Sequence, residues 1–204
     1  MKLRLFLGPA VLFGLLVSSV RSQTVITFDD LPNSTTGTFI ADGYQGLDWT
    51  NFGVGNAILR SNVFGVSGYN YGMVSPSNVA FNGFGLPAEI DSGTNFNFLS
   101  TYLTGAWNSN LNIEVQGFSG ATLLYDTTVV ASATSPTLFT FNYANVNQLV
   151  FNSFGGQNAG FASGSGEEFV MDNLTFEFVP EPSSLLLVAL GGVSLVALLR
   201  RKRA

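Results

Sequence analysis

Apolar and polar residues alternate along many short segments between residues 24 and 178. Over 111–115, for example, Leu, Ile and Val alternate with Asn and Glu. A period of two is typical of strands that turn one face to a core and the other to solvent. The pattern therefore predicts strands over residues 24–28, 95–104, 110–117, 122–130, 137–141, 148–152 and 168–178.

Residues that favour turns separate these segments. Gly, Ser and Asn are frequent over 117–120, 132–136 and 155–166, and no helical period extends beyond a turn or two. Many short strands joined by such turns are typical of antiparallel sandwiches. We therefore predict an all-β fold, an antiparallel β-sandwich of jelly-roll type, over residues 23–178. Residues 39–86 are the least regular part of this region.

The first 22 residues form a separate unit. Lys2 and Arg4 precede an apolar stretch over 5–17, and small and polar residues follow up to Ser22. A basic start, an apolar centre and small residues before the cleavage point are typical of a secretory signal peptide. We expect residues 1–22 to form a signal helix that signal peptidase removes, so that the domain is exported. An uncleaved membrane anchor is the alternative.

A second apolar stretch lies near the C-terminus. As a helix, residues 183–199 would span roughly 25 Å at about 1.5 Å per residue, which is close to the minimum for a bilayer. Four consecutive basic residues follow within 200–204, and such clusters stay on the cytoplasmic side of a membrane. We therefore expect a single transmembrane helix over 183–199, a basic cytoplasmic end over 200–204, and the β domain outside the membrane.

The residues between the β domain and this helix carry a motif. Val179, Pro180, Glu181 and Pro182 precede the apolar run, so 179–204 holds Pro-Glu-Pro, a hydrophobic helix and an Arg-rich end in that order. This tail resembles the PEP-CTERM sorting tail of bacterial surface proteins. The resemblance implies processing by exosortase, a membrane transpeptidase, and a place in the cell envelope, often beside exopolysaccharide. An ordinary single-span anchor with a Pro-containing linker is the alternative.

Composition excludes several functions. The chain has no His and no Cys, which rules out an imidazole metal centre, a thiolate zinc site, a disulfide and a Ser-His-Asp triad. The whole chain has a net charge of −5, but residues 23–178 hold twelve acids and one base, Arg60, a formal charge of −11. Nucleic-acid binding depends on Lys and Arg. Nucleic acid is therefore not an expected partner, whereas cations and neutral glycans are.

An aromatic stretch over 43–52 offers a candidate binding face. Tyr44, Trp49 and Asn51 are its candidate ligand-binding residues, because aromatic rings stack on sugar rings and amide side chains bond to hydroxyls. The alternative places Tyr44 and Trp49 at one end of the sandwich core.

Three aspartates form a candidate metal site. Asp172 is in phase with the apolar residues of its predicted strand, so its charge needs a partner in the core. Asp29 and Asp30 follow the first predicted strand, and oxygen ligands suit calcium. The arrangement resembles jelly-roll carbohydrate-binding modules, in which acids of the first and last strands hold a structural calcium ion. The alternative is that Asp172 accepts backbone hydrogen bonds and that Asp29 and Asp30 are turn residues.

Some acidic residues are also candidates for catalysis. Two carboxylates suffice for glycoside hydrolysis, and the candidates are Glu89, Asp91, Glu114, Glu167 and Glu168. Their positions in the sequence do not place any two of them at a defined distance in space. No phosphate loop or nucleophile motif is present. We therefore expect a non-catalytic exported surface protein. A carbohydrate-binding module that acts on exopolysaccharide is the alternative, and a glycoside hydrolase is a third hypothesis.

Overall fold

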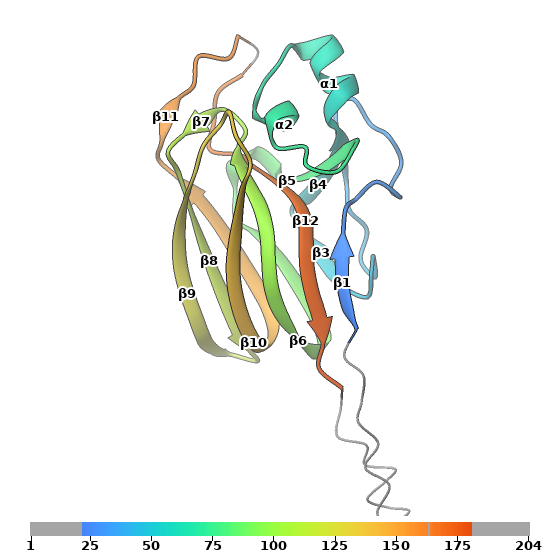
Figure 1. Cartoon of the computed structure of the whole chain (residues 1–204). Coiled ribbons are helices and arrows are strands. Elements are labelled where there is room, and N and C mark those ends of the chain that lie inside the picture. Colours follow the sequence, from blue (N-terminus) through green and yellow to red (C-terminus); the bar gives the residue numbers. More distant parts are fainter. Residues whose placement is uncertain (1–21, 163, 181–204) are drawn as a thin grey trace, which may run out of the picture.

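The computed structural model describes residues 22–162 and 164–180 (Figure 1). The predicted signal peptide, apart from its last residue, and the predicted transmembrane helix and basic end lie outside these residues, as do Glu181 and Pro182. Within the described residues, no helix has the length and apolar character needed to cross a membrane.

Strands dominate the described region. In chain order they are β1 (Gln23–Ile26), β2 (Thr38–Phe39), β3 (Asp48–Thr50), β4 (Phe52–Asn56), β5 (Asn78–Asn82), β6 (Ala88–Gly105), β7 (Asn108–Ser109), β8 (Leu111–Ser119), β9 (Thr122–Ala131), β10 (Thr137–Phe154), β11 (Gln157–Asn158) and β12 (Phe169–Phe178). The helices are α1 (Ala57–Phe64), α2 (Gly68–Tyr71) and the 3₁₀ turn η1 (Gly83–Gly85). Every strand pair is antiparallel. The predicted all-β antiparallel class is therefore confirmed, while the jelly-roll connectivity stays a prediction.

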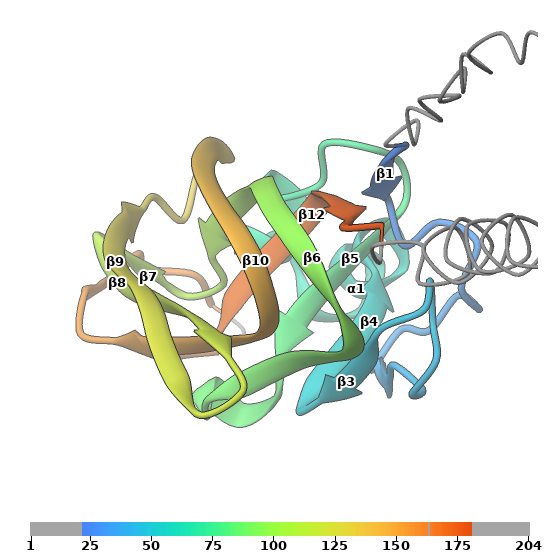
Figure 2. The ribbon, with the colours of Figure 1, turned by 90° about the horizontal axis from the view of Figure 1, so that it is seen from below.

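Two strands of 18 residues each, β6 and β10, belong to both halves of the sheet. The first half also holds β2, β4, β5 and β12, and the second half also holds β3, β8 and β9. The C-terminal half of β6 pairs with β12 and with the first half of β10, whereas its N-terminal half pairs with β3 and with the second half of β10. The register of the β6–β10 pair shifts between Thr140 and Gln148, where Asn142 and Asn145 adopt positive φ angles of 52° and 58°. Such irregularities bend a strand, so the sheet turns back on itself around a core. Seen from below, the strands follow one another around that core from β9 to β4 (Figure 2).

The bend explains one difference from the sequence pattern. Residues 137–141 and 148–152 were predicted as two strands, but they belong to the single strand β10. The Asn-rich stretch between them resembles a turn in sequence and serves as a bend in the structure. The predicted strand over 95–104 likewise begins earlier, at Ala88, because β6 continues through a register shift in its pairing with β10 between Asp91 and Phe96.

Helix α1 has no amphipathic signal in the sequence. Its apolar residues Ile58, Leu59, Val63 and Phe64 are all exposed, and only Ala57 is buried. The helix forms because Asn56 caps it, with the Asn56 Oδ1 accepting a hydrogen bond of 2.9 Å from the Leu59 amide. It ends at Gly65, where φ is 82°.

The core is held together by edge-to-face aromatic contacts. Phe151, on the second half of β10, is fully buried and lies 5.7 Å from Phe52 and 6.1 Å from Phe98, ring centroid to centroid. A tilted contact at 5.8 Å joins it to Phe169 on β12. Because Phe98 and Phe169 belong to the first half of the sheet, Phe151 joins the two halves.

Both ends of the described region leave the domain at the same place. β1 pairs with β12, so that Gln23 lies opposite Glu177, and the Val179 amide donates to the Asn95 carbonyl at 2.9 Å. Helices α1 and α2 lie at the opposite end of the molecule (Figure 1). The segment that carries the sorting motif therefore starts at the end remote from the helices.

The position of Phe151 gives a stability prediction. We expect Phe151→Ala to lower the free energy of unfolding by about 3–5 kcal/mol, because it removes a large buried ring and leaves a cavity between the two halves of the sheet. Phe154→Ala is the matched control, since Phe154 lies on the same strand and is 44% exposed. Urea unfolding of residues 23–178 measures both changes, and equal losses would contradict the central role of Phe151.

Candidate functional site

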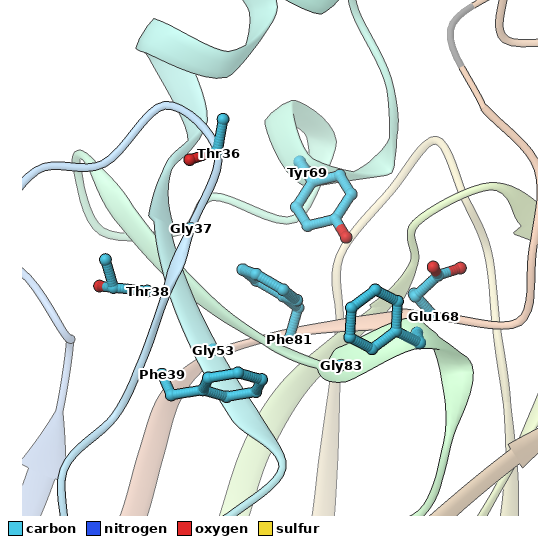
Figure 3. A pocket seen from close by; sticks show the side chains of 10 residues that line it. Thr36, Gly37, Thr38, Phe39, Gly53, Tyr69, Phe81, Gly83 and Glu168 are labelled. Carbon is cyan, nitrogen blue, oxygen red and sulfur yellow. The ribbon is translucent and has the colours of Figure 1, made fainter.

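A hollow of about 240 Å³ opens on the side of the sheet that β2, β4 and β5 form, beneath helix α2 (Figure 3). Aromatic rings make most of its wall, and the polar groups are hydroxyls and one carboxylate. The residues on which its chemistry depends are Thr36, Phe39, Tyr69, Phe81, Phe84 and Glu168.

Two aromatic rings at this hollow face solvent. Phe39 is 67% exposed and Phe84 is 83% exposed, which is unusual for phenylalanine because exposure forfeits the hydrophobic gain of burial. Phe84 also has a φ of 57° inside η1, a conformation that non-glycine residues seldom adopt. Exposed apolar surface beside a concavity is typical of an interaction site.

The turn that carries Phe84 is tied down by two asparagines. Asn51 Nδ2 donates to the carbonyls of Gly83 and Pro87 at 3.1 and 2.9 Å. The buried Asn82 accepts from the Phe169 amide through its Oδ1 at 2.8 Å. These bonds hold the turn against β12 and fix where Phe84 leaves the backbone.

Glycines leave space for the ring of Phe81 at the base of the hollow. A Cβ on Gly53 would lie 2.7 Å from the Phe81 ring, and one on Gly37 would lie 2.5 Å from it, both too close for carbon atoms. The Phe81 ring also meets Tyr69 edge to face, with centroids 5.3 Å apart. The absence of side chains at Gly37 and Gly53 thus leaves room for the Phe81 ring, which forms the base of the hollow.

Glu168 is the charged residue of the hollow. The Tyr69 hydroxyl points towards the side of the hollow on which Glu168 lies (Figure 3). Burial raises the pKa of the Glu168 carboxyl, and Arg60 partly offsets the rise. Its Oε2 is buried and has no hydrogen-bond partner among the described residues. The same carboxyl group accepts a hydrogen bond from its own backbone amide, which also lowers its pKa.

Arg60, the single base of the described region, acts as a brace beside the hollow. Its guanidinium carbon lies 4.0 Å from the centre of the Tyr69 ring, a cation–π contact. Its Nη1 donates to the carbonyls of Thr35 and Thr36 at 3.1 and 2.9 Å. The positive charge is therefore used to hold the segment before β2 against α2.

The residues predicted to bind a ligand lie elsewhere and have other tasks. Trp49 is only 5% exposed, and its ring meets Phe28 and Phe52 edge to face at 5.8 and 5.4 Å. The half-buried Tyr44 donates from its hydroxyl to Asp30 at 2.5 Å. Trp49 thus has a core position, which corrects its assignment to an open sugar-binding face. Asn51 does not line the hollow. It contacts the turn that carries Phe84.

Asp172 is fully buried and has four hydrogen bonds. Its Oδ2 accepts from the amides of Val74 and Ser75 at 2.7 and 2.8 Å, and its Oδ1 accepts from the Ser75 hydroxyl at 3.0 Å and the Asn173 amide at 2.7 Å. Burial raises the pKa of Asp172 to about 6, and these four bonds oppose the rise. The carboxylate therefore pins the segment between α2 and β5 to β12.

The three aspartates predicted to bind calcium do not gather into one site. Asp29 accepts from the Asn78 amide at 2.9 Å, and Asp30 accepts from Tyr44. No group of three or more acidic side chains among the described residues is arranged to hold a metal ion. The geometry corrects the predicted cluster, because each carboxylate has its own partner within the protein.

The candidate catalytic acids are likewise dispersed. Glu89 accepts from Gln148 Nε2 at 3.1 Å, and Asp91 lies two residues along the same strand, where burial and then Glu89 raise its pKa. Glu114 lies on β8 beside Asn152, and Glu167 accepts from the Gly155 amide at 2.6 Å. Glu168 is the only one of the five that lines the hollow.

The hollow was not found from the sequence because its wall comes from five separate segments. Phe39, Tyr69, Phe81 and Glu168 have no common spacing. The one local signal is Phe84 between two glycines, since a large apolar residue in a turn has no core to enter.

Comparison with known proteins identifies the tail. Residues 178–203 match the PEP-CTERM protein-sorting motif, which confirms the predicted sorting tail. The motif indicates an extracellular protein sorted by exosortase and associated with the cell envelope. No curated protein sequence matches the chain.

Three solved structures are similar to this chain at low sequence identity. A DUF4465 family protein from Bacteroides caccae is 14% identical, with 80% of this chain and 96% of that chain covered and a TM-score of 0.47. The Stig cyclase Fisc from Fischerella sp. TAU is 14% identical (78% and 99% covered, TM-score 0.43). TmCBM61, in complex with β-1,4-galactotriose, is 10% identical (76% and 99% covered, TM-score 0.41).

The buried carboxylate predicts a pH dependence. Because the folded pKa of Asp172, about 6, lies above its ordinary value of 3.8, the folded protein binds the proton more tightly than the unfolded chain. The stabilisation is fully present below about pH 4, is lost as the pH rises through about 6, and amounts to at most about 3 kcal/mol. Urea unfolding between pH 4.5 and 7.5 should therefore show a stability that falls with rising pH.

Two variants separate this effect from the general charge of the domain. Asp172→Asn should lower the unfolding free energy at pH 7, because both carboxylate oxygens accept hydrogen bonds and the Asn side-chain NH₂ would face donors instead of accepting from them, and it should flatten the pH slope. Asp126→Asn removes an exposed charge and should leave the slope unchanged. A slope that Asp172→Asn does not alter would refute this account.

Proposed function

We propose that this chain is a non-catalytic surface protein whose β domain binds an uncharged polysaccharide in the hollow. The observation that carries the proposal is the pair of solvent-facing rings, Phe39 and Phe84, on either side of an aromatic base with a carboxylate at its edge. The sorting motif at residues 178–203 supports a location in the cell envelope, where a polysaccharide is a natural ligand for such a domain.

The chemistry of the hollow suits a sugar ring. A pyranose has apolar C–H faces that stack on aromatic rings and hydroxyls around its edge. Phe39 and Phe84 offer the stacking surfaces, and Glu168 offers an acceptor for a sugar hydroxyl. The threonines of the β2 segment add hydroxyls that both donate and accept. The volume of about 240 Å³ is below the roughly 300–1,000 Å³ of pockets for drug-sized ligands, which suits a short stretch of a chain.

Charge favours a neutral ligand. Residues 23–178 have a formal charge of −11, and the charged group in the hollow is Glu168. Arg60 contacts the Tyr69 ring and two backbone carbonyls, so its guanidinium group is engaged within the protein. An acidic polysaccharide would meet repulsion without a free cation to pair with.

The absence of catalysis is part of the proposal. Glycoside hydrolysis requires two carboxylates on opposite sides of the scissile bond, about 5–9.5 Å apart. Glu168 is the one acid that lines the hollow, and the neighbouring Glu167 is engaged by the Gly155 amide. Binding without cleavage is what a single carboxylate supports.

Substitution of the exposed rings tests the proposal. We expect Phe39→Ala and Phe84→Ala each to weaken binding of a neutral polysaccharide at least about tenfold, about 1.4 kcal/mol, because each removes a stacking surface. Affinity electrophoresis or calorimetry with neutral and acidic polysaccharides measures the change, and reducing-end assays of the same mixtures should show no cleavage.

Phe154→Ala is the control, because Phe154 is an exposed phenylalanine outside the hollow. All three variants should keep the melting temperature of the parent protein, since none removes a buried ring. Retained binding in both hollow variants, or no binding of any neutral polysaccharide by the parent, would overturn the proposed function.

The sorting tail has a separate test. We expect the mature protein in the envelope of its own host to lack residues 200–204, because processing near Pro180–Pro182 would detach the hydrophobic stretch and the basic end. Mass spectrometry of the C-terminal peptide measures this. Replacement of Pro180, Glu181 and Pro182 by alanine should leave the basic end attached, and an intact C-terminus in the parent protein would contradict processing.

A further inference from the structure

The strand β9 ends the sheet with an edge that pairs with no other strand. It pairs with β8 on one side and is last in the strand order. Other edge strands of the described region are short, with two residues in β2 and three in β3, and the first half of β10 is interrupted by Asn142. β9 has 10 residues. An open edge of this length presents backbone donors and acceptors to any strand that comes alongside.

The sequence of β9 lacks the features that normally keep such an edge from pairing. Proteins protect open edges with lysine, proline, inward-pointing charges or β-bulges. Residues 122–131 contain no Lys, Arg or Pro and one acid, Asp126, and the one register shift of β9 lies at its start, between Leu123 and Tyr125. Asp126 already accepts from Gln116 Nε2 at 3.1 Å. Leu123, Leu124 and Val130 are 46%, 44% and 53% exposed, so apolar surface lines the same edge.

From this edge we infer that two copies of the chain associate through β9, antiparallel and about a two-fold axis. A symmetric pair brings the same strand together with itself. Among the registers centred on one residue, that on Thr127 pairs residues 123–131, whereas that on Thr128 pairs only residues 125–131. Centred on Thr127, the pairing sets Tyr125 opposite Val129 and Asp126 opposite Thr128. Centred on Asp126, it would set two carboxylates opposite each other, which is destabilising.

The Thr127 register also preserves the faces of the sheet. Tyr125 and Val129 both pack against the core on the inner side of β9, and opposite residues in an antiparallel pair lie on the same face. The core side of one copy therefore continues into the core side of the other. The second half of the sheet becomes one continuous sheet across both copies.

The pairing leaves the hollow open. β2 and β4 stand at the opposite end of the strand order from β9, and Figure 1 shows β9 on the far side of the molecule from β1 and β4. The two strands run in opposite directions in the pair, so the two β12 ends point in opposite directions. The arrangement thus suits copies of which at least one has left the membrane.

Single cysteines test the register, because the chain has no Cys of its own. Opposite residues in an antiparallel pair have Cα atoms about 4.5–5.5 Å apart, within the range that a disulfide bridges. Diagonal neighbours are about 7–8 Å apart, beyond that range. In the full chain purified in detergent and mildly oxidised, Thr127→Cys should give a disulfide-linked dimer and Thr128→Cys should not, while Asp126→Cys combined with Thr128→Cys should give the dimer again.

Charge substitutions give an independent readout by sedimentation of the same full chain. Thr127→Lys sets two lysines opposite each other and should weaken dimerisation at least about fivefold. Thr128→Lys faces Asp126 and should leave the dimer as strong or stronger. The inference is overturned if the parent sediments as a monomer at all concentrations, if Thr127→Cys does not crosslink, or if Thr128→Cys crosslinks as well as Thr127→Cys.

Discussion

The passage of β6 and β10 from one half of the sheet to the other is the constraint on which the rest of the structure depends. Two strands of 18 residues can close around a core only if they bend, and the bend in β10 lies where Asn142 and Asn145 take positive φ angles. Asparagine tolerates this conformation better than other side chains with a Cβ. Once the bend is made, Phe151 faces Phe98 and the aromatic core can form. The hollow and the open edge of β9 follow, because they are the two ends of the strand order that this folding back creates.

Polar side chains inside the domain work as anchors for the irregular segments. Asp172 holds the segment between α2 and β5, Asn82 and Asn51 hold the turn of Phe84, and Arg60 holds the segment before β2. Each anchor joins a segment without regular hydrogen bonding to a strand or helix that has it, so that buried backbone groups find partners. Two of these segments, the one before β2 and the turn of Phe84, form part of the wall of the hollow. A rigid wall lowers the entropy lost on binding, which is an advantage for a site that offers few polar contacts.

The sequence predicted the strands in which apolar and polar residues alternate. It did not predict the segments whose conformation depends on contacts with residues distant in the chain. Residues 111–119 show the pattern clearly because β8 has one face in the core and one in solvent. Helix α1 shows no such pattern, since a capping asparagine and the chain around it, rather than an apolar face, hold it in place. Trp49 illustrates the same limit for the site, because a ring between glycine turns reads equally well as a binding surface or as a core residue. The fold decides this through Phe28 and Phe52, which contact the buried Trp49 ring edge to face. Neither these contacts nor the hollow around Phe39 follow from local spacing.

The formal charge of −11 on residues 23–178 bears on both proposed interactions in the same direction. Two such domains repel each other, yet the edge through which they would meet carries one acid per copy, and salt screens charges beyond about 8 Å at physiological ionic strength. The hollow, with Glu168 at its rim, repels acidic ligands in the same way and leaves neutral sugar chains unaffected. A pair joined through β9 would hold two hollows on one rigid body, and a polysaccharide repeats its binding unit along its length. The second contact then forms at a high effective concentration, so that weak single sites give firm attachment without any added charge or contact. The same acidic surface that excludes nucleic acid is therefore compatible with a protein that crosslinks neutral matrix chains.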